Sequence, residues 1–200
     1  MYRADYFLTS ILKRKFFQRD PKNVALDLLG TKLVRRTGVQ KFEGMIAETE
    51  AYYGDKDPAS RAYDGMKSFN KPMWNIPGRL FIYNVHKYWM LNIVAHYPND
   101  IGAVLIRAVE PLDGIEYMKK NRQTSDTSQL TNGPGKLTIS FNIDKNLNEL
   151  DITSEKSNVH ILKYKKEFRI SSSKRIGVKK DLRQNMRFFI DCNKYVSKRK

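Results

Sequence analysis

Between residues 80 and 109 the chain contains three runs of aromatic, aliphatic and β-branched residues. They cover residues 80–85, 89–95 and 103–109, with short polar breaks between them. Such runs are typical of adjacent antiparallel strands. We therefore expect them to form the core of an antiparallel sheet.

Other segments predict elements on both sides of this core. Asp20-Pro21, a following apolar pattern and Gly30 have the form of a short helix with an N-cap, a proline in its first turn and a glycine stop. Residues 32–37 and 42–50 flank Gly38, as the strands of a β-hairpin do. Two more strands are expected at residues 159–162 and 186–190.

The connections are also predictable from composition. Pro111, followed by Ile115 and Met118, suggests a second helix that starts at the proline. The polar residues 122–131 and the glycine- and proline-rich residues 53–77 are expected to be loops, and a long ordered loop is often functional. The chain shows no internal repeat or domain boundary, so we expect one domain over residues 1–200.

Charge and cysteine content restrict the class of protein. Lys and Arg number 37 against 21 Asp and Glu, a formal net charge of +16, which favours a polyanionic partner. The single cysteine, Cys192, excludes an internal disulfide scaffold and a cysteine-based zinc site. No apolar run approaches the roughly 20 residues of a membrane span. No signal-peptide core precedes the basic residues 13–15, and a cytoplasmic protein is expected.

Glu48, Glu50 and Tyr52 occupy alternate positions, so in a strand their side chains share one face. A carboxylate on such a face is a candidate general base for water, and the pair is a candidate Mg²⁺ site of a nuclease. An ordinary solvent-exposed strand face explains the same pattern equally well.

A second group combines Tyr83, His86, Tyr88 and Trp89 with Lys87, the composition found where bases stack and phosphates are neutralised. Aromatic residues at strand spacing are nevertheless more often part of a core. Arg107 interrupts an apolar run, where a buried charge needs an anionic partner. Either Glu50 or a DNA phosphate would serve.

Three further features are weaker. Gly133-Pro134-Gly135-Lys136-Leu137 lacks the spacing of a nucleotide-binding loop, so it is more typical of a structural turn, with Lys136 a weak phosphate-site candidate. His96 and His160 have no metal-ligand spacing with each other or with Cys192. They are interpreted as ordinary histidines.

Taken together, ordered blocks of the chain resemble the alkyladenine (3-methyladenine) DNA glycosylase family, over roughly residues 24–197. The blocks are ALDLLGTKLVRR, ETEAYYGDKDPASRAYDG, PGRLFIYNVHKYWMLNI, GAVLIRAVEPLDG, NGPGKL and RIGV, followed by RFF. The resemblance implies an α+β fold: one compact domain around a curved, mainly antiparallel sheet with a few flanking helices. It also implies a basic face that binds duplex DNA, a pocket for one extruded nucleotide, and no metal or organic cofactor.

The resemblance implies roles for individual residues. Glu50 is expected to be the general base that deprotonates water, and Arg107 to help hold that water and a phosphate. Tyr52 and Tyr83 match the positions that sandwich the flipped base. Asn92 matches an asparagine that crowds the 2-amino group of normal guanine. Glu48 receives no catalytic role, and replacing it is expected to matter less than replacing Glu50.

Two positions depart from the family pattern. Arg61 replaces a histidine that hydrogen-bonds the bound purine. Pointing inward, it is expected to disfavour cationic bases and favour hypoxanthine, whereas pointing outward it would contact a phosphate; the cost of burying an unpaired guanidinium favours the outward placement. His86 replaces the tyrosine that wedges into the duplex, and Tyr88 is a second candidate for that task.

The resulting hypothesis is a monofunctional, monomeric DNA glycosylase that flips an alkylated or deaminated purine and hydrolyses its N-glycosidic bond, leaving an abasic site. No protein partner is indicated. Two alternatives stay open. One is a nucleic-acid-binding protein that keeps the fold without catalysis. The other is a Mg²⁺-dependent nuclease that uses Glu48 and Glu50.

Overall fold

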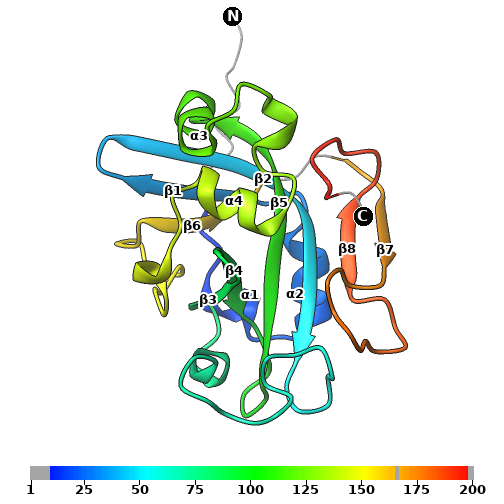
Figure 1. Ribbon diagram of the computed structural model, residues 1–200. Helices are drawn as coiled ribbons and strands as arrows, with labels where there is room; N and C mark the ends of the chain where they lie inside the picture. The colour runs from blue at the N-terminus through cyan, green and yellow to red at the C-terminus, as the bar shows by residue number, and fades with distance from the viewer. Residues whose placement is uncertain (1–9, 165–166, 198–200) are drawn as a thin grey trace, which may run out of the picture.

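The structure is a computed structural model that describes residues 10–164 and 167–197 (Figure 1). Its central element is the long strand β2 (Gln40–Tyr53). One edge of β2 pairs with β5 (Gly102–Asp113) along most of its length. The other edge pairs first with β1 (Lys32–Thr37) and then with β8 (Arg187–Ile190). The sheet therefore branches at the middle of β2.

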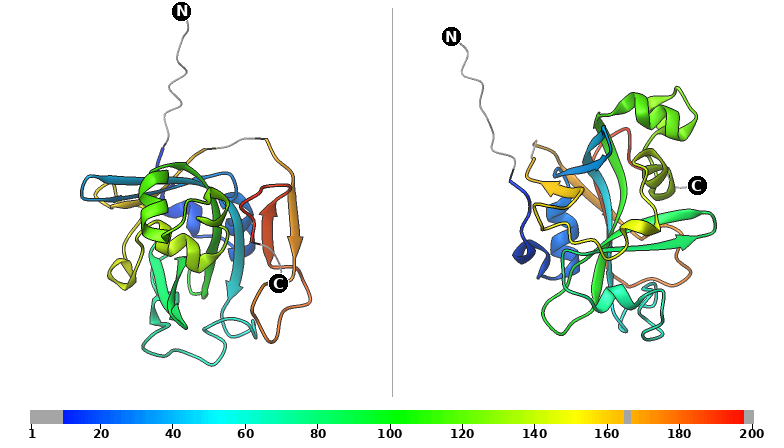
Figure 2. Two further views of the ribbon diagram at one scale, coloured as in Figure 1. Left: turned by 45° about the horizontal axis from the view of Figure 1, so that its top comes forward. Right: turned by 90° about the vertical axis from the view of Figure 1, so that its left-hand side faces the viewer.

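The remaining strands extend the sheet on both sides. They are β3 (Leu80–Val85), β4 (Tyr88–Val94), β6 (Val159–Leu162) and β7 (Ile170–Ser173). The order is β3-β4-β5-β2-β1-β6, with β8 on β2 and β7 on β8, and every pairing is antiparallel. The curled antiparallel sheet, with a few helices around it, confirms the expected α+β fold (Figure 2).

The main core lies where helix α2 (Pro21–Leu28) packs against β2 and β5. The side chain of Asp20 caps this helix by accepting hydrogen bonds from the backbone N–H groups of Lys22 and Asn23, as the sequence predicts. The short helix α1 (Arg14–Phe17) precedes it. Thr49 anchors the helix to β2 by donating a hydrogen bond to the carbonyl oxygen of Ala25.

The region after β5 differs from the sequence-based expectation. Pro111 does not begin a helix; it lies in β5 opposite Gly44, at a register irregularity. Helix α3 (Ile115–Arg122) begins after Gly114, whose φ is +78°. The glycine- and proline-rich motif at residues 133–137 is not a simple turn, because it opens helix α4 (Pro134–Ser140). Within the described part of the chain, three short 3₁₀ helices complete the helical elements: η1 (Lys71–Trp74), η2 (Thr127–Gln129) and η3 (Lys145–Leu147).

The expected loop at residues 53–77 is ordered against the sheet face opposite α2. Ala62 and Met73 from this loop form a small second apolar cluster with Phe81, Val94 and Ala103. The cluster fixes the loop beside the hairpin of β3 and β4, which projects from the body of the molecule in the right-hand view of Figure 2. The loop thereby forms one wall of the sheet face that carries the candidate site.

Within the described residues, no helix is long and apolar enough to cross a membrane. The prediction about a signal peptide depends partly on residues 1–9, which lie outside the described residues. The last three residues of the basic tail also lie outside them.

Candidate active site

The candidate site residues belong to one cross-strand row. Phe81 on β3 pairs with Asn92 on β4, Asn92 with Leu105 on β5, Leu105 with Glu50 on β2, and Glu50 with Arg187 on β8. Residues directly opposite each other in antiparallel strands present their side chains on the same face. Residues far apart in sequence therefore share one face of the sheet with the Glu50 carboxylate.

Glu50 is fully buried, and both of its carboxylate oxygens accept hydrogen bonds. The Tyr52 hydroxyl donates to Oε2 at 2.6 Å, and the backbone N–H of Ile176 donates to Oε1 at 2.8 Å. The Arg107 guanidinium lies 3.2 Å from Oε1. Oε2 retains acceptor capacity for one further donor, such as a water molecule.

Arg107 lies at an irregularity between β2 and β5. The register jumps from Glu48 opposite Ala108 to Thr49 opposite Ile106, which leaves Arg107 without a cross-strand partner. Neither strand gains a residue there, because Ile46 pairs with Val109 and Thr49 with Ile106. Arg107 follows Leu105 by two positions and therefore lies on the same face of the sheet as the Glu50 carboxylate. Burial alone would lower the pKa of Arg107, but the negative charges of Glu50 and Glu48 raise it, so the guanidinium stays charged.

Glu48 is also fully buried, which rules out the interpretation of this strand face as an exposed one. Its Oε1 accepts hydrogen bonds from Arg107 Nε at 2.7 Å, Arg187 Nε at 2.6 Å and Ser197 Oγ at 2.7 Å. Its Oε2 accepts from the backbone N–H of Ser197 at 2.6 Å. Glu48 and Glu50 thus face two guanidinium groups in a buried, charge-balanced quartet.

Tyr52 is held from behind by Arg175, whose guanidinium carbon lies 4.5 Å from the centre of the tyrosine ring. Arg175 pairs with both carboxylate oxygens of Asp57 at 2.7 Å and also contacts Asp181. Burial and the charge of Glu50 raise the pKa of Tyr52, and the Tyr83 hydroxyl adds to this shift, so the Tyr52 phenol remains a hydrogen-bond donor.

Tyr83 stacks on Phe81, with ring centres 4.9 Å apart. The guanidinium carbon of Arg61 lies 5.0 Å from the centre of the Tyr83 ring. The Arg61 side chain is exposed and forms no ion pair with another described residue. It is therefore both solvent-exposed and stacked on an aromatic residue predicted to bind the base.

Asn92 lies in the same row and is buried. Its side-chain nitrogen donates to the carbonyl oxygens of Phe81 at 3.0 Å and Met90 at 3.1 Å. These two bonds hold the amide plane in one orientation. The side-chain oxygen of Asn92 receives no hydrogen bond within the described part of the chain.

The predicted DNA-contacting residues gather at the tip of the β3–β4 hairpin. His86 and Lys87 form its two-residue turn, with His86 at a φ of +54°, and both are exposed. The Tyr88 ring packs closely against Gly135 of α4. A side chain at position 135 would not fit, since its Cβ atom would lie only 2.7 Å from the Tyr88 ring. The ammonium group of Lys136 donates to the side-chain oxygens of Gln129 and Asn132. Trp89 packs against the main core.

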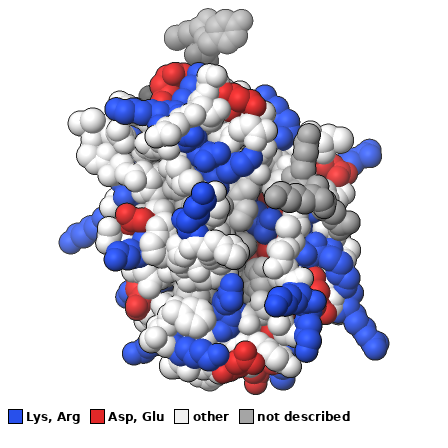
Figure 3. Space-filling view, in the orientation of Figure 1, with Lys and Arg blue, Asp and Glu red and all other residues white. Residues whose placement is uncertain are grey.

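Figure 3 shows the face toward which the hairpin tip projects (Figure 2). Lys and Arg are spread across this face, whereas Asp and Glu gather in smaller groups. A polyanion approaching this face therefore meets an excess of positive charge.

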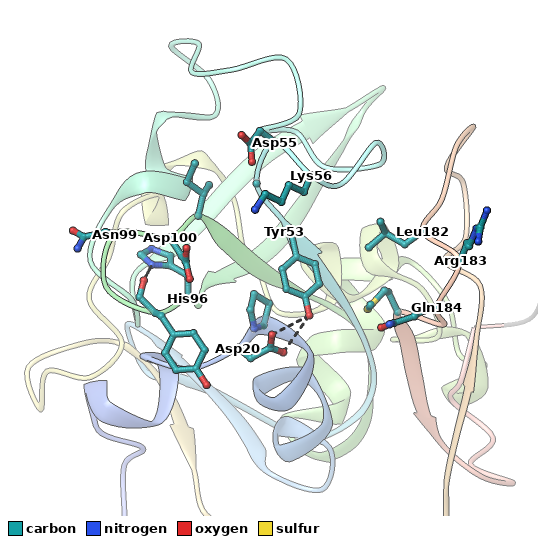
Figure 4. A pocket seen from close by; sticks show the side chains of 15 residues that line it. Asp20, Tyr53, Asp55, Lys56, His96, Asn99, Asp100, Leu182, Arg183 and Gln184 are labelled. Atoms are coloured by element: carbon teal, nitrogen blue, oxygen red, sulfur yellow. Dashed lines mark hydrogen bonds between the residues drawn. The ribbon is translucent and has the colours of Figure 1, made fainter.

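A separate cavity of about 780 Å³ lies beyond the end of β2 (Figure 4). It is lined by Tyr53, His96 and Arg183, among others, and by none of the predicted catalytic or base-binding residues. The Tyr53 hydroxyl contacts the Asp20 carboxylate there. The ring nitrogens of His96 lie 2.7 and 3.1 Å from the carbonyl oxygens of Tyr97 and Asn75, so this histidine is engaged by the backbone.

Metal-ligating side chains do not gather among the described residues: no three of His, Cys, Asp and Glu come together in a way that suits a metal ion. His160 contacts the carbonyl oxygen of Ser154, and Cys192 is an exposed free thiol.

Sequence reasoning missed several parts of this site. Arg175, Arg187, Ser197 and the backbone N–H of Ile176 were assigned no role, yet each touches Glu48, Glu50 or Tyr52. The blocks RIGV and RFF contain all of these except Ser197, and an arginine in each was the available signal. The partners remained unidentified because up to 149 residues separate them from the carboxylates.

Comparison with known proteins supplies the family. A profile of the family described as Methylpurine-DNA glycosylase (MPG) matches residues 15–194. A protein of Clostridium novyi named "Putative 3-methyladenine DNA glycosylase" is 40% identical over 201 residues, covering 94% of this chain and 98% of the relative. Proteins with the same name are 38% identical in Chlorobium phaeobacteroides (strain DSM 266) and 35% identical in Aeropyrum pernix, covering 94% of this chain and 97% and 93% of the relatives.

These matches extend over almost the whole chain. The curled sheet, the basic face and the carboxylate of Glu50 are features expected from the family resemblance of the sequence. The chain therefore belongs to the methylpurine-DNA glycosylase family, whose members are DNA glycosylases.

Proposed function

We propose that this enzyme removes alkylated or deaminated purines from duplex DNA, among them 3-methyladenine, 7-methylguanine and hypoxanthine. In this proposal the damaged nucleotide is flipped out of the helix and its N-glycosidic bond is hydrolysed. The products are the free base and an abasic site. The observation that carries the proposal is a fully buried glutamate, Glu50, hydrogen-bonded to the Tyr52 hydroxyl in a chain of this family.

Water is the nucleophile in the proposed reaction. Glu50 accepts a proton from the water, the water oxygen bonds to C1′, and the bond from C1′ to the purine nitrogen breaks. The bonding electrons pass to the purine, so a cationic 3-methyladenine leaves as a neutral base. Arg107 holds the water and compensates the charge of the adjacent phosphate. Hypoxanthine is neutral and needs a proton to leave equally well.

Selection of the base is assigned to the aromatic and amide side chains. Tyr52 and Tyr83 offer their ring faces to a flipped purine, which stacks well when it is electron-poor. Asn92, held by two backbone carbonyls, is a rigid obstacle to the 2-amino group of normal guanine. His86 fills the gap that the flipped nucleotide leaves in the duplex, and Lys87, Tyr88 and Lys136 are assigned to the DNA backbone.

The alternatives are less compatible with these contacts. A Mg²⁺-dependent nuclease needs free carboxylate oxygens at Glu48, but Glu48 already accepts hydrogen bonds from two guanidinium groups and from Ser197. Displacing two cations to admit a third is unfavourable. A binding protein without catalysis has no need for a buried, ionisable glutamate under the base pocket.

Replacing Glu50 tests the proposal. Glu50→Gln keeps the shape of the side chain but cannot accept a proton, so base release is expected to fall below detection, while binding to lesion-containing duplex DNA is retained or strengthened. Single-turnover release of free base and titration of labelled duplex DNA measure the two properties. Glu116→Gln, at an exposed surface glutamate, is the matched control. Excision by Glu50→Gln at the wild-type rate would contradict the proposal.

A further inference from the structure

Arg107 is bound on three sides, by the proposed general base and by two groups to which the reaction assigns no step. Its Nε donates to Glu48 at 2.7 Å, its Nη1 lies 3.2 Å from Glu50, and its Nη2 lies 3.4 Å from Ser197 Oγ. Only 6% of the residue is exposed. An arginine side chain has four rotatable bonds, so its direction depends on such contacts. Glu48 forms the shortest of them.

Glu48 is in turn oriented by the end of the described chain. Ser197 holds both carboxylate oxygens, with its backbone N–H on Oε2 at 2.6 Å and its hydroxyl on Oε1 at 2.7 Å. Arg187 joins the two by donating from Nε to Glu48 and from Nη2 to the carbonyl oxygen of Ser197. The carboxylate therefore has one orientation, in which it faces Arg107.

We infer that Glu48 and Ser197 are positioning residues for the excision reaction: they hold the Arg107 guanidinium at the Glu50 carboxylate. Without the negative charge of Glu48, two guanidinium groups face one carboxylate. Arg107 is then free to rotate or to pair more tightly with Glu50, and either change removes it from the place where water is held. This inference rests on the proposed function and assigns to Glu48 a larger role than the family resemblance does.

The test measures the excision rates of two variants, Glu48→Gln and Ser197→Ala, each in the wild-type protein and in an Arg107→Met background. Glu48→Gln is expected to slow single-turnover excision roughly 10- to 100-fold, since it loses a charge-assisted contact, and Ser197→Ala to slow it by a smaller factor. The affinity for lesion-containing DNA is expected to fall by a much smaller factor than the excision rate, because only one of the DNA contacts is displaced. In an Arg107→Met background the same two substitutions should cause no further loss, because they act through Arg107.

A stability control separates positioning from general loss of structure. Asp151→Asn breaks a half-buried ion pair with Arg14, in a part of the molecule that does not touch the site. It is expected to lower the thermal midpoint of unfolding and to leave the excision rate unchanged below that midpoint. If Glu48→Gln does not fold, Ser197→Ala still carries the test, because its backbone N–H continues to hold Glu48 Oε2.

A readout without catalysis distinguishes this inference from the proposed function. The Nε–H proton of Arg107, followed by NMR in ¹⁵N-labelled protein, is expected to be protected from exchange with water in the wild type and to lose protection in Glu48→Gln. Two results would overturn the positioning role. One is that Glu48→Gln and Ser197→Ala slow excision in the Arg107→Met background as much as they do in the wild type. The other is that the Nε–H proton of Arg107 stays protected in Glu48→Gln. Absence of base release by the wild type would instead overturn the proposed function alone.

Discussion

At the scale of single residues, each tyrosine assigned to the base pocket has a guanidinium against its ring. The guanidinium on Tyr52, from Arg175, is neutralised by Asp57 and Asp181. The one on Tyr83, from Arg61, has no acidic partner among the described residues. The two sides of the proposed pocket therefore differ in net charge, and the positive side is the one formed by Tyr83 and Arg61.

This difference predicts the preference among damaged bases. A cationic base stacked near Arg61 is repelled by about 1–2 kcal/mol at a partly exposed site, whereas neutral hypoxanthine is not. Arg61→His, which carries a mostly neutral ring at pH 7.5, is expected to raise the ratio of 3-methyladenine to hypoxanthine excision roughly 5- to 20-fold. Parallel base-release assays on both lesions measure the ratio.

The exposed Arg36, on the distant strand β1, provides the matched substitution Arg36→His, which should leave the ratio unchanged. An unchanged ratio in Arg61→His, accompanied by weaker binding to every DNA, would instead indicate that Arg61 contacts a phosphate.

At the scale of elements, the β3–β4 hairpin places a histidine in a left-handed turn position, with φ at +54°. A residue with a side chain is strained in this conformation by about 1 kcal/mol, and glycine is not. The turn therefore retains a side chain at some cost to stability, which agrees with the wedging role proposed for His86.

His86→Gly is expected to change stability and function in opposite directions. The free energy of unfolding should rise by up to about 1 kcal/mol, while excision from duplex DNA should slow because the gap in the helix is no longer filled. Excision from single-stranded DNA, where no gap forms, should change much less. Denaturant unfolding and paired excision assays measure these effects, and an equal loss on both substrates would argue against a wedge.

A second element-scale feature is the attachment of the loop at residues 53–77. Asp57 is fully buried, pairs with both terminal nitrogens of Arg175, and accepts the backbone N–H groups of Tyr53 and Ala59. It links the beginning of the loop to the segment that follows β7. Breaking this pair leaves part of the Arg175 charge uncompensated inside the protein.

Asp57→Asn is accordingly expected to lower the free energy of unfolding by about 3 kcal/mol and to slow excision, since Arg175 also supports the Tyr52 ring. Asp55→Asn, two residues away at an exposed position, is the control and should alter neither quantity. Urea denaturation of the three proteins provides the comparison. Similar midpoints for Asp57→Asn and Asp55→Asn would contradict the role of the buried pair.

At the scale of the whole molecule, tyrosine ionisation connects stability to pH. Burial, followed by the charge of Asp20 and its hydrogen bond, raises the pKa of Tyr53. Tyrosines of the unfolded chain ionise near pH 10, so above that pH the unfolded state binds fewer protons than the folded one. The contribution of Tyr53 to the free energy of unfolding is therefore constant below pH 10 and decreases as the pH rises further.

Tyr53→Phe should reduce this alkaline loss. The difference in slope from the wild type is expected to be less than about 1 kcal/mol per pH unit, because the half-buried phenol is partly screened by solvent. Unfolding free energies measured between pH 8 and 11 provide the test. Parallel curves for the two proteins across this range would show that Tyr53 does not contribute.

Features that depend only on neighbouring residues could be predicted before the fold was known. The period of two in a strand places Glu48, Glu50 and Tyr52 on one face, and all three meet in the structure through Arg107 or directly. Strand β3 has the predicted bounds, and Asp20 caps α2 as expected. Capping, turn chemistry and side-chain alternation act over a few residues, so they can be read from a short segment.

The partners of the buried charges depend instead on long-range contacts of the folded chain. Pro111 has the local features of a helix start, but pairing with β2 keeps it in a strand. Whether Glu48 is exposed or enclosed depends on Arg187 and Ser197, which lie 139 and 149 residues away in sequence. A buried ion pair forms only where folding removes water and brings its partners together. No pattern within one segment contains that information, which is why the shell around the carboxylates is visible only in the folded chain.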